Sequence, residues 1–321
     1  MPRPLDMAMI LEARRALEGR VRRTPIEESR PLSEAAGVPV SLKLESQQLT
    51  GSFKIRGAFF RLLALTPEER RAGVITCSAG NHGKAVAYVA RELGVPATIY
   101  VPRSVDESKY RGIVALGADA QRSDCDGFDE TEALARDAAA RSGRPYVSAY
   151  DDERILAANG GTLAAEVLED APEARTFVLP VGGAGLAGGF AFYAKERLPA
   201  CRVVGCQLAS SPALALSLEK GEAVTRLAPV ATTAGGLEGG IGRTGFGVLR
   251  TRVDAVALLT EEDIFGAVRF LLAEHQYLIE PSSAVTVAAI LTGKSGPLST
   301  PAVAVISGRN VALSTLKRIL A

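Results

Sequence analysis

One lysine of this sequence lies in a setting that favours nucleophilic chemistry. Lys54 stands between Phe53 and Ile55 in the run TGSFKIRG, residues 50–57. A lysine amine attacks a carbonyl carbon only after losing its proton, so its pKa must fall from about 10.4, through burial or a neighbouring cation such as Arg56. Most lysines are exposed surface groups, and that alternative remains for Lys54 on its sequence alone.

A second polar group lies between a predicted strand and a predicted helix. The loop SAGNHG, residues 78–83, offers the hydroxyl of Ser78, the amide of Asn81 and the imidazole of His82 beside the start of a helix. Such a loop suits a small carboxylate, because backbone N–H groups at a helix start attract anions. The alternative is structural: an N-cap at Ser78 or Asn81, and a His82 that forms hydrogen bonds only within the protein.

A glycine-rich run, PVGGAGLAGG at residues 180–189, also follows a predicted strand and opens a helix. Backbone N–H groups without intervening side chains form a cradle for phosphate. The spacing Gly183-x-Gly185-x-x-Gly188 matches the dinucleotide fingerprint, but the next strand ends near Gln207 without the acid that should bind a ribose. Phosphate is therefore favoured over a nicotinamide dinucleotide, with a tight structural turn as the alternative.

A hydroxyl group ends the last apolar run of the chain. Ser307 follows AVAVI, residues 302–306, where the end of a strand can direct a side chain into a cleft. The alternative is that Ser307 caps the final helix.

The elements that must position these groups alternate along the chain. Short apolar runs followed by amphipathic stretches predict strands and helices in turn. The predicted strands cover 74–77, 97–101, 146–148, 176–181, 202–208, 253–259 and 302–306, and the predicted helices cover 58–65, 84–93, 108–116, 128–140, 186–197, 214–220, 261–274 and 311–320. This alternation predicts an α/β fold of two doubly wound parallel sheets, with ligands beyond the carboxyl ends of the strands.

The composition excludes several classes of protein. A net charge of +1 indicates neither nucleic acid nor an anionic membrane as a partner. Four cysteines without a C-x-x-C pair, and two histidines, predict neither a disulfide scaffold nor a Cys/His metal cage. The uncharged stretch 177–194 contains Pro180 and several glycines, so we interpret it as a buried strand and turn and not as a membrane span. The start shows no secretory signal, and we expect a cytoplasmic protein.

Taken together and in this order, the motifs resemble one family. The sequence is similar to the serine/threonine dehydratase group of fold-type II pyridoxal-phosphate enzymes, which carries G-S-F-K-x-R-G-A, S-x-G-N-H, a glycine loop and a late S-G-x-N. The resemblance covers nearly the whole chain, and its last motifs look most like the branch of hydroxyectoine-utilisation dehydratases. It implies a tryptophan-synthase-β-like fold with the cofactor in the cleft between a large domain (1–72 and 149–321) and a small domain (73–148).

The resemblance also implies roles for individual residues. Lys54 would carry pyridoxal 5'-phosphate, Phe53 would flank the ring, and Ser307 would face its pyridine nitrogen. Asn81 would bind the 3-oxygen of the cofactor, and Glu280 would approach the amino or hydroxyl side of the substrate. Two sets remain: the phosphate would be held by Gly182, Gly183, Ala184, Gly185 and Leu186, and the substrate carboxylate by Ser78, Asn81 and His82.

The implied activity is the removal of water and ammonia from threonine or serine, giving a 2-oxo acid. A hydroxyectoine-derived or 3-hydroxy amino acid, such as 3-hydroxyaspartate, is the first alternative substrate. Serine racemisation, β-replacement and a catalytically silent cofactor-binding protein are further alternatives, and an oxidoreductase is disfavoured by the missing acid near Gln207. The family suggests a homodimer.

Some positions depart from the family pattern. Ala184 interrupts four glycines and suits phosphate binding only with a negative φ. Ala79 replaces the serine that serves racemases as a second acid/base. The segment after Gln207 has no carboxylate, so we expect no metal ion. Gly160 and Gly235 replace larger residues, which predicts an altered or enlarged substrate pocket.

Overall fold

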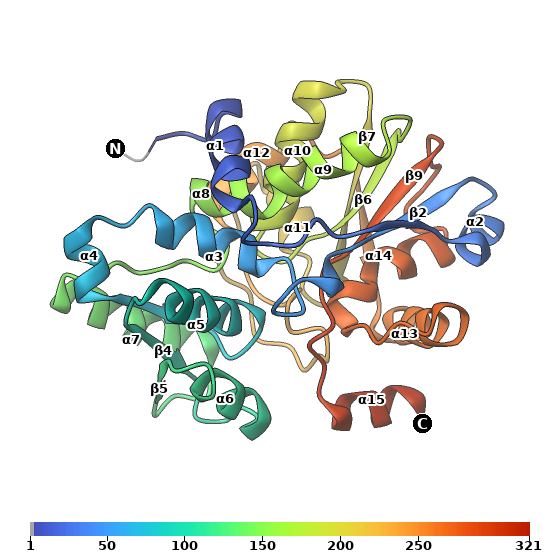
Figure 1. The fold of residues 1–321 in the computed structure, drawn as a ribbon. Coiled ribbons are helices and arrows are strands. Elements are labelled where there is room, and N and C mark those ends of the chain that lie inside the picture. The colour runs from blue at the N-terminus through green and yellow to red at the C-terminus, as the bar shows by residue number, and fades with distance from the viewer. Residues whose placement is uncertain (1–2) are drawn as a thin grey trace.

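The computed structural model describes residues 3–321, with every side chain except that of Ser108. Its strands form two separate sheets, of six and three strands (Figure 1). The large sheet has the order β1-β2-β9-β6-β7-β8 and the small sheet the order β3-β4-β5. All neighbouring strands are parallel except β1 and β2. The predicted fold class, with two parallel sheets in alternation with helices, is confirmed.

The bounds of the elements follow the chain from end to end. The strands are β1 Ile26–Glu28, β2 Val40–Leu44, β3 Val74–Cys77, β4 Ala97–Val101, β5 Asp119–Arg122, β6 Thr176–Pro180, β7 Arg202–Leu208, β8 Ala255–Leu259 and β9 Ala302–Ile306. The first helices are α1 Met7–Leu17, α2 Arg30–Ala36, η1 Glu45–Gln47, α3 Lys54–Leu63, α4 Pro67–Ala72, α5 Asn81–Leu93, α6 Glu107–Val114 and α7 Phe128–Ser142. The remaining helices are α8 Glu153–Leu156, η2 Ala157–Gly161, α9 Thr162–Asp170, α10 Gly185–Arg197, α11 Ala213–Lys220, α12 Arg243–Leu249, α13 Glu261–His275, α14 Pro281–Leu291 and α15 Leu313–Leu320.

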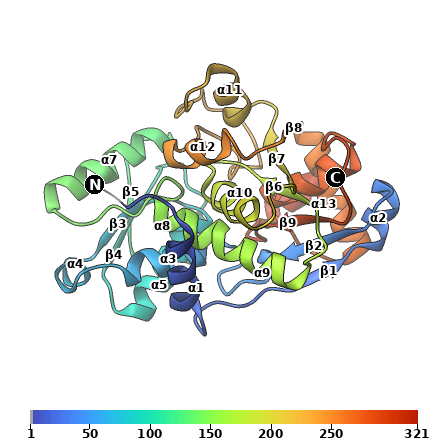
Figure 2. The ribbon, with the colours of Figure 1, turned by 90° about the horizontal axis from the view of Figure 1, so that it is seen from above.

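The large sheet is buried on both faces. Along β6, Phe177 and Leu179 join the apolar core on one side, with α10 and α9, whereas Val178 joins the core on the other side, with α14 and α13. This follows from the period of two in a strand, and it explains why β6 is apolar at nearly every position. Figure 2 shows α10 lying along the sheet, over β6.

The small sheet contacts α5, α6 and α7, and α5 packs in turn against α3. Its three strands all lie between residues 74 and 122, whereas the strands of the large sheet come from both flanking segments. The predicted division into domains 73–148 and 1–72 plus 149–321 remains a proposal.

Some local predictions were wrong. Residues 146–148 form no strand: Tyr146 makes only an isolated bridge to Ile75. The third strand of the small sheet is instead β5, whose sequence DAQR is polar because it lies mostly exposed at the edge. The uncharged stretch 177–194 forms β6, the glycine turn and the first part of α10, as predicted. Within residues 3–321, no helix is long and apolar enough to cross a membrane.

Candidate active site

The loop before Lys54 is bound directly to the segment after the last strand. The backbone N–H of Phe53 donates to the carbonyl of Ser307 at 3.1 Å, and that of Arg309 donates to the carbonyl of Gly51 at 2.9 Å. Gly51 has a φ of +77°, a conformation that glycine adopts without strain. Residues more than 250 positions apart in the sequence are therefore neighbours, and Lys54 lies beside the end of β9.

Lys54 begins α3 as a half-buried residue whose amine is desolvated. Its Nζ donates a hydrogen bond to the carbonyl of Ala149 at 2.7 Å. Burial lowers the pKa of this amine to about 8, and the negative charge of Glu280 partly opposes the shift. The burial required for a nucleophilic lysine is thus present.

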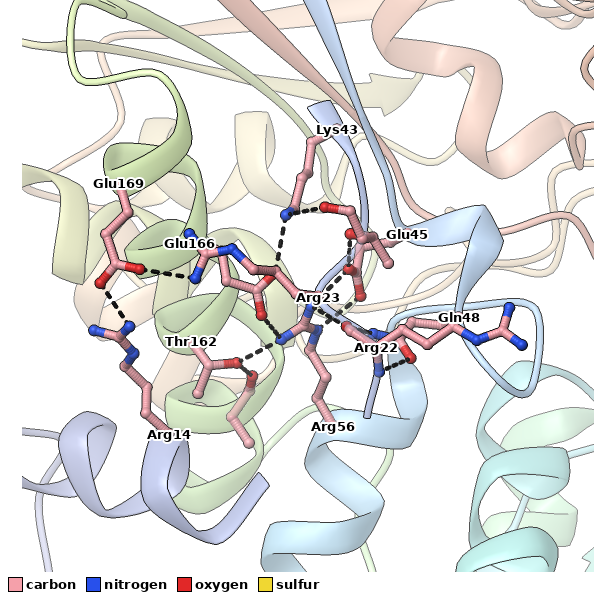
Figure 3. Close-up of polar contacts among 12 residues, drawn as sticks. Arg14, Arg22, Arg23, Lys43, Glu45, Gln48, Arg56, Thr162, Glu166 and Glu169 are labelled. Atoms are coloured by element: carbon pink, nitrogen blue, oxygen red, sulfur yellow. Dashed lines mark hydrogen bonds and ion pairs between the residues drawn. The ribbon is translucent and has the colours of Figure 1, made fainter. Parts of the chain in front are cut away.

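The second predicted cause of that shift, the charge of Arg56, is not what lowers the pKa. The guanidinium of Arg56 is turned into a buried network of charges, where it bonds both oxygens of Glu45 (2.7 and 2.8 Å) and both of Glu166 (2.7 and 2.9 Å) (Figure 3). Lys43 joins the network through Glu166 at 2.8 Å. Two carboxylates neutralise two cations here, so Arg56 fixes α3 to η1 and α9. The pKa of Lys54 is therefore lowered by desolvation and not by the charge of Arg56.

The start of α5 offers free donors where the loop 78–83 was expected to bind a carboxylate. Gly80 is the N-cap, and no side chain of the described residues caps the helix. The hydroxyl of Ser78 accepts from the N–H of Gly80 at 3.2 Å and so keeps its own proton available to a ligand. A Cβ at Gly83 would lie 2.2 Å from the carbonyl of Ser78, so glycine is required for this close turn.

His82 was expected to bind the same carboxylate, and its hydrogen bonds favour a different role. Its Nε2 lies 3.0 Å from the hydroxyl of Thr76 and 3.2 Å from the carbonyl of Val147. A carbonyl only accepts, so Nε2 carries the proton; burial, with the charge of Lys54, lowers the pKa of this imidazole to about 3. The remaining Nδ1 is then an acceptor and repels a carboxylate. In this arrangement His82 fixes the loop from inside the protein.

The glycine loop joins β6 to α10. A Cβ at Gly182 would lie 2.2 Å from the carbonyl of Gly236, and one at Gly183 would lie 2.2 Å from the Tyr150 ring. These two glycines are therefore required for packing, whatever the loop binds. The start of α10, at Gly185 and Leu186, is buried, and no side chain caps it. A buried helix start without a cap needs partners for its N–H groups, and a phosphate supplies them.

Ala184 differs from expectation in its conformation. Its φ is +70°, in the left-handed region, where an alanine costs about 1–2 kcal/mol. The residue is the N-cap of α10, and its methyl group packs where Gly245 leaves room, since a Cβ on Gly245 would lie 2.6 Å from that of Ala184. The negative φ that was expected for phosphate binding is therefore not found: the loop keeps the backbone path of a glycine and accommodates the methyl group against Gly245.

A chain of amides lies beside Lys54, and only part of it was foreseen. Asn81 donates from Nδ2 to Glu280 at 2.7 Å and accepts at Oδ1 from Asn310 at 2.6 Å. Burial raises the pKa of the Glu280 carboxyl to about 7, and the bond from Asn81 acts in the opposite direction. Glu280 therefore exists in both protonation states near neutral pH, which is the condition for a proton carrier. Asn310 was part of a motif only, with no role assigned.

Other departures from the family pattern have structural explanations. A Cβ at Gly160 would lie 2.0 Å from the carbonyl of Leu186, so this glycine lets η2 pack against α10 and opens no pocket there. At Gly235 nothing lies within 4 Å of the Cβ position, so space is open at that point. Gln207 accepts the N–H groups of Leu214 and Ala215, at 2.9 and 3.1 Å, and thereby fixes the start of α11.

The starts of α5 and α10, the amine of Lys54 and the carboxyl of Glu280 form one candidate active site. Known proteins are similar to this chain in sequence. The chain matches the model of the family described as "Pyridoxal-phosphate dependent enzyme" over residues 17–308. The chain belongs to this family.

Relatives in the family extend over almost the whole chain. An L-threonine ammonia-lyase of Geobacter sulfurreducens is 37% identical over 98% of this chain and 78% of its own length. A catabolic L-threonine dehydratase of Escherichia coli is 33% identical over 98% of this chain and 96% of its own. The structure of maize serine racemase superimposes with a TM-score of 0.91 at 30% identity, over 99% of both chains. The fold-type II identification is confirmed, and the hydroxyectoine branch stays a prediction.

The residues present fit pyridoxal phosphate. The uncapped start of α10 suits its phosphate, and Lys54 is an amine of lowered pKa for its aldehyde. The buried hydroxyls of Thr50 and Ser52 have no hydrogen-bond partner within residues 3–321, so this loop retains polar atoms that a ligand can satisfy. Ser52, Tyr150 and the carbonyl of Ala149 escaped the sequence analysis because each acts through a contact between distant segments.

Proposed function

We propose that this protein is a pyridoxal-phosphate-dependent ammonia-lyase that removes water and then ammonia from a β-hydroxy amino acid such as threonine or serine. The observation that carries the proposal is the lowered pKa of Lys54, whose amine interacts with the charge of Glu280 and with His82 at the start of α5. Its bond to the carbonyl of Ala149 places it next to Tyr150, the ring that packs on the glycine loop before α10. The relatives named threonine ammonia-lyase and threonine dehydratase support the same reaction.

The site divides the work among its own residues. The start of α10 would hold the cofactor phosphate, with Asn81 and Ser307 toward the polar atoms of the ring. When bound, the cofactor supplies an electron sink that makes the α-proton of an amino acid acidic. The N–H groups at the start of α5 and the hydroxyl of Ser78 bind the substrate carboxylate. The amine of Lys54 accepts the α-proton, because its lowered pKa leaves part of it neutral near pH 7.

The protonated form of Glu280 can supply a proton on the substrate side of the site. The sum for threonine is the loss of one water from the α- and β-carbons, followed by hydrolysis of the unsaturated amine to 2-oxobutyrate and ammonia. Racemisation needs a second acid/base on the opposite face, and Ala79 has no titratable group there. The lyase is therefore favoured over the racemase activity of the maize structural relative.

The test is turnover by purified protein with added cofactor. We expect 2-oxobutyrate and ammonia in equal amounts from L-threonine, and a visible absorption band that borohydride fixes to the protein and that is lost in Lys54→Ala. Inversion of serine without release of oxo acid would indicate a racemase instead, and a sulfide-dependent product would indicate β-replacement. A bound cofactor with no turnover across a broad panel of amino acids would indicate a silent binding protein.

We also propose a cytoplasmic homodimer without a metal ion. The resemblance to the family supports this proposal. Light scattering of the purified protein measures the oligomer, and activity after treatment with a chelator tests the independence from divalent ions.

A further inference from the structure

A second lysine lies next to the carboxylate loop. Lys84 follows Asn81 by three residues in α5, so the two side chains share one face of the helix. The Nζ of Lys84 donates to Oδ1 of Asn310 at 2.9 Å, and Nδ2 of Asn310 donates to Asn81 at 2.6 Å. Asn310 is itself fixed by a bond to the carbonyl of Thr50 at 2.9 Å. The position of the Lys84 ammonium is thus fixed, and Asn310 links it to Asn81 of the active site through two hydrogen bonds.

This ammonium carries a charge that no carboxylate within residues 3–321 pairs with. Within residues 3–321, Lys84 and Arg309 take part in no ion pair, although Lys84 is half-buried. Burial lowers the pKa of Lys84, and the positive charge of Arg309 lowers it further. The negative charge of Glu280 opposes these effects, but its carboxyl is bonded to Asn81 and not to Lys84.

The buried network of Figure 3 provides the contrast. There Lys43 and Arg56 each contact a glutamate at 2.8 Å or less, as expected for cations removed from water. Lys54 is a buried amine without an ion pair, and its chemistry requires that state. Two neighbouring cations without a carboxylate, one of them half-buried, raise the energy of the free protein unless an anion completes the site.

We propose that Lys84 and Arg309 bind a second carboxylate, on the side chain of the substrate, so that the enzyme prefers an anionic β-hydroxy amino acid to threonine. This inference rests on the proposed function, because it needs the first carboxylate at the start of α5. One helical turn separates Asn81 from Lys84, which suits a short dicarboxylic amino acid. The same loss of water and ammonia would convert such a substrate to a 2-oxo dicarboxylic acid.

The experiment compares two substrates, 3-hydroxyaspartate and L-threonine, by their ratio of kcat/KM. We expect a ratio above one in the unaltered protein. Lys84→Gln should reduce the ratio about tenfold or more, the effect of one charge-assisted hydrogen bond. Lys84→Arg should restore most of it. Lys220→Gln, at an exposed lysine that ends α11, is the matched control and should leave the ratio unchanged.

The outcomes separate the two proposals. Turnover of threonine with a ratio that Lys84→Gln does not change would overturn the second-carboxylate site and leave the lyase standing. Release of oxo acid from neither substrate would overturn both. Succinate serves as a free dicarboxylate: if it alters threonine turnover through Lys84 while the substrate ratio is unaffected, the cations bind a separate anion and the substrate assignment is wrong. The absorption band of the bound cofactor confirms that each variant is folded.

Discussion

The lowered pKa of Lys54 predicts how fast the cofactor-free protein captures pyridoxal phosphate at each pH. Only the neutral amine attacks the aldehyde. With a pKa of about 8, about one tenth of the protein carries a neutral amine at pH 7, whereas an ordinary lysine at 10.5 would give roughly 0.03%. The neutral fraction of Lys54 at pH 7 is therefore about 300 times that of an ordinary lysine. The rate of cofactor capture should be half-maximal near pH 8.

A substitution at Glu280 tests the electrostatic effect of its carboxylate on the pKa of Lys54. The charge of Glu280 raises the pKa of Lys54, so Glu280→Gln should move the half-maximal point below pH 8. Glu219→Gln, at an exposed residue of α11, is the control and should leave it in place.

The assay is stopped-flow absorption of the cofactor band after mixing with cofactor-free protein, from pH 6 to 11. A parallel series with pyridoxal, which has no phosphate, excludes titration of the ligand phosphate as the cause of the pH dependence. The variant Lys54→Ala measures how much cofactor is captured by other amines of the protein. A rate that keeps rising tenfold per pH unit up to pH 10 would refute the reasoning, because it would show that burial does not perturb this amine. A half-maximal point that rises in Glu280→Gln would refute the role of the carboxylate.

Three further predictions follow from contacts of the site. Gly183→Ala would place a Cβ 2.2 Å from the Tyr150 ring, so we expect about 1–3 kcal/mol less stability to urea and weaker cofactor retention; an unchanged cofactor affinity would contradict this. Arg56→Met leaves buried carboxylates without their main partner and should cost about 3–5 kcal/mol in the same urea titration, while a loss below 1 kcal/mol would show that the network relaxes. Asn81→Ala removes a hydrogen bond that lowers the pKa of Glu280, so this pKa should rise above about 7, as measured by infrared titration of the carboxyl with Glu280→Gln as the blank.

The sequence predicted the fold well where strands are buried on both faces. The run TFVLP, at β6, is apolar because each face packs on a core, and its pattern was unmistakable. The edge strand β5 has no such pattern, since its residues are mostly exposed, and it was missed. In this protein, an apolar run indicates a strand that is buried, and an exposed strand such as β5 has no apolar run.

The parts of the site that could be predicted are those whose residue types indicate a particular chemistry. A lysine in the run TGSFKIRG and a glycine loop after a strand were recognised from the sequence, and the structure places both at ends of elements. The sequence offered two causes for a lowered pKa of Lys54, burial and the charge of Arg56, and could not decide between them. Arg56, two residues away, turns toward Glu45 and Glu166. The side on which a helical residue packs depends on partners from other segments, which a local pattern does not contain.

The pairing of the Lys54 loop with residues 307–309 has a consequence for folding during synthesis of the protein. β9 lies inside the large sheet, between β2 and β6, so the sheet is incomplete until the last strand has been synthesised. On the ribosome, a nascent chain of some 290 residues would hold the lysine and the glycine loop but not the strand that brings Ser307 to Phe53. Such an intermediate should expose an ordinary lysine to the cell, and the cofactor should be captured only after β9 has joined the sheet. A chain that stops before β9 should therefore contain Lys54 but lack the contact that prepares it to react.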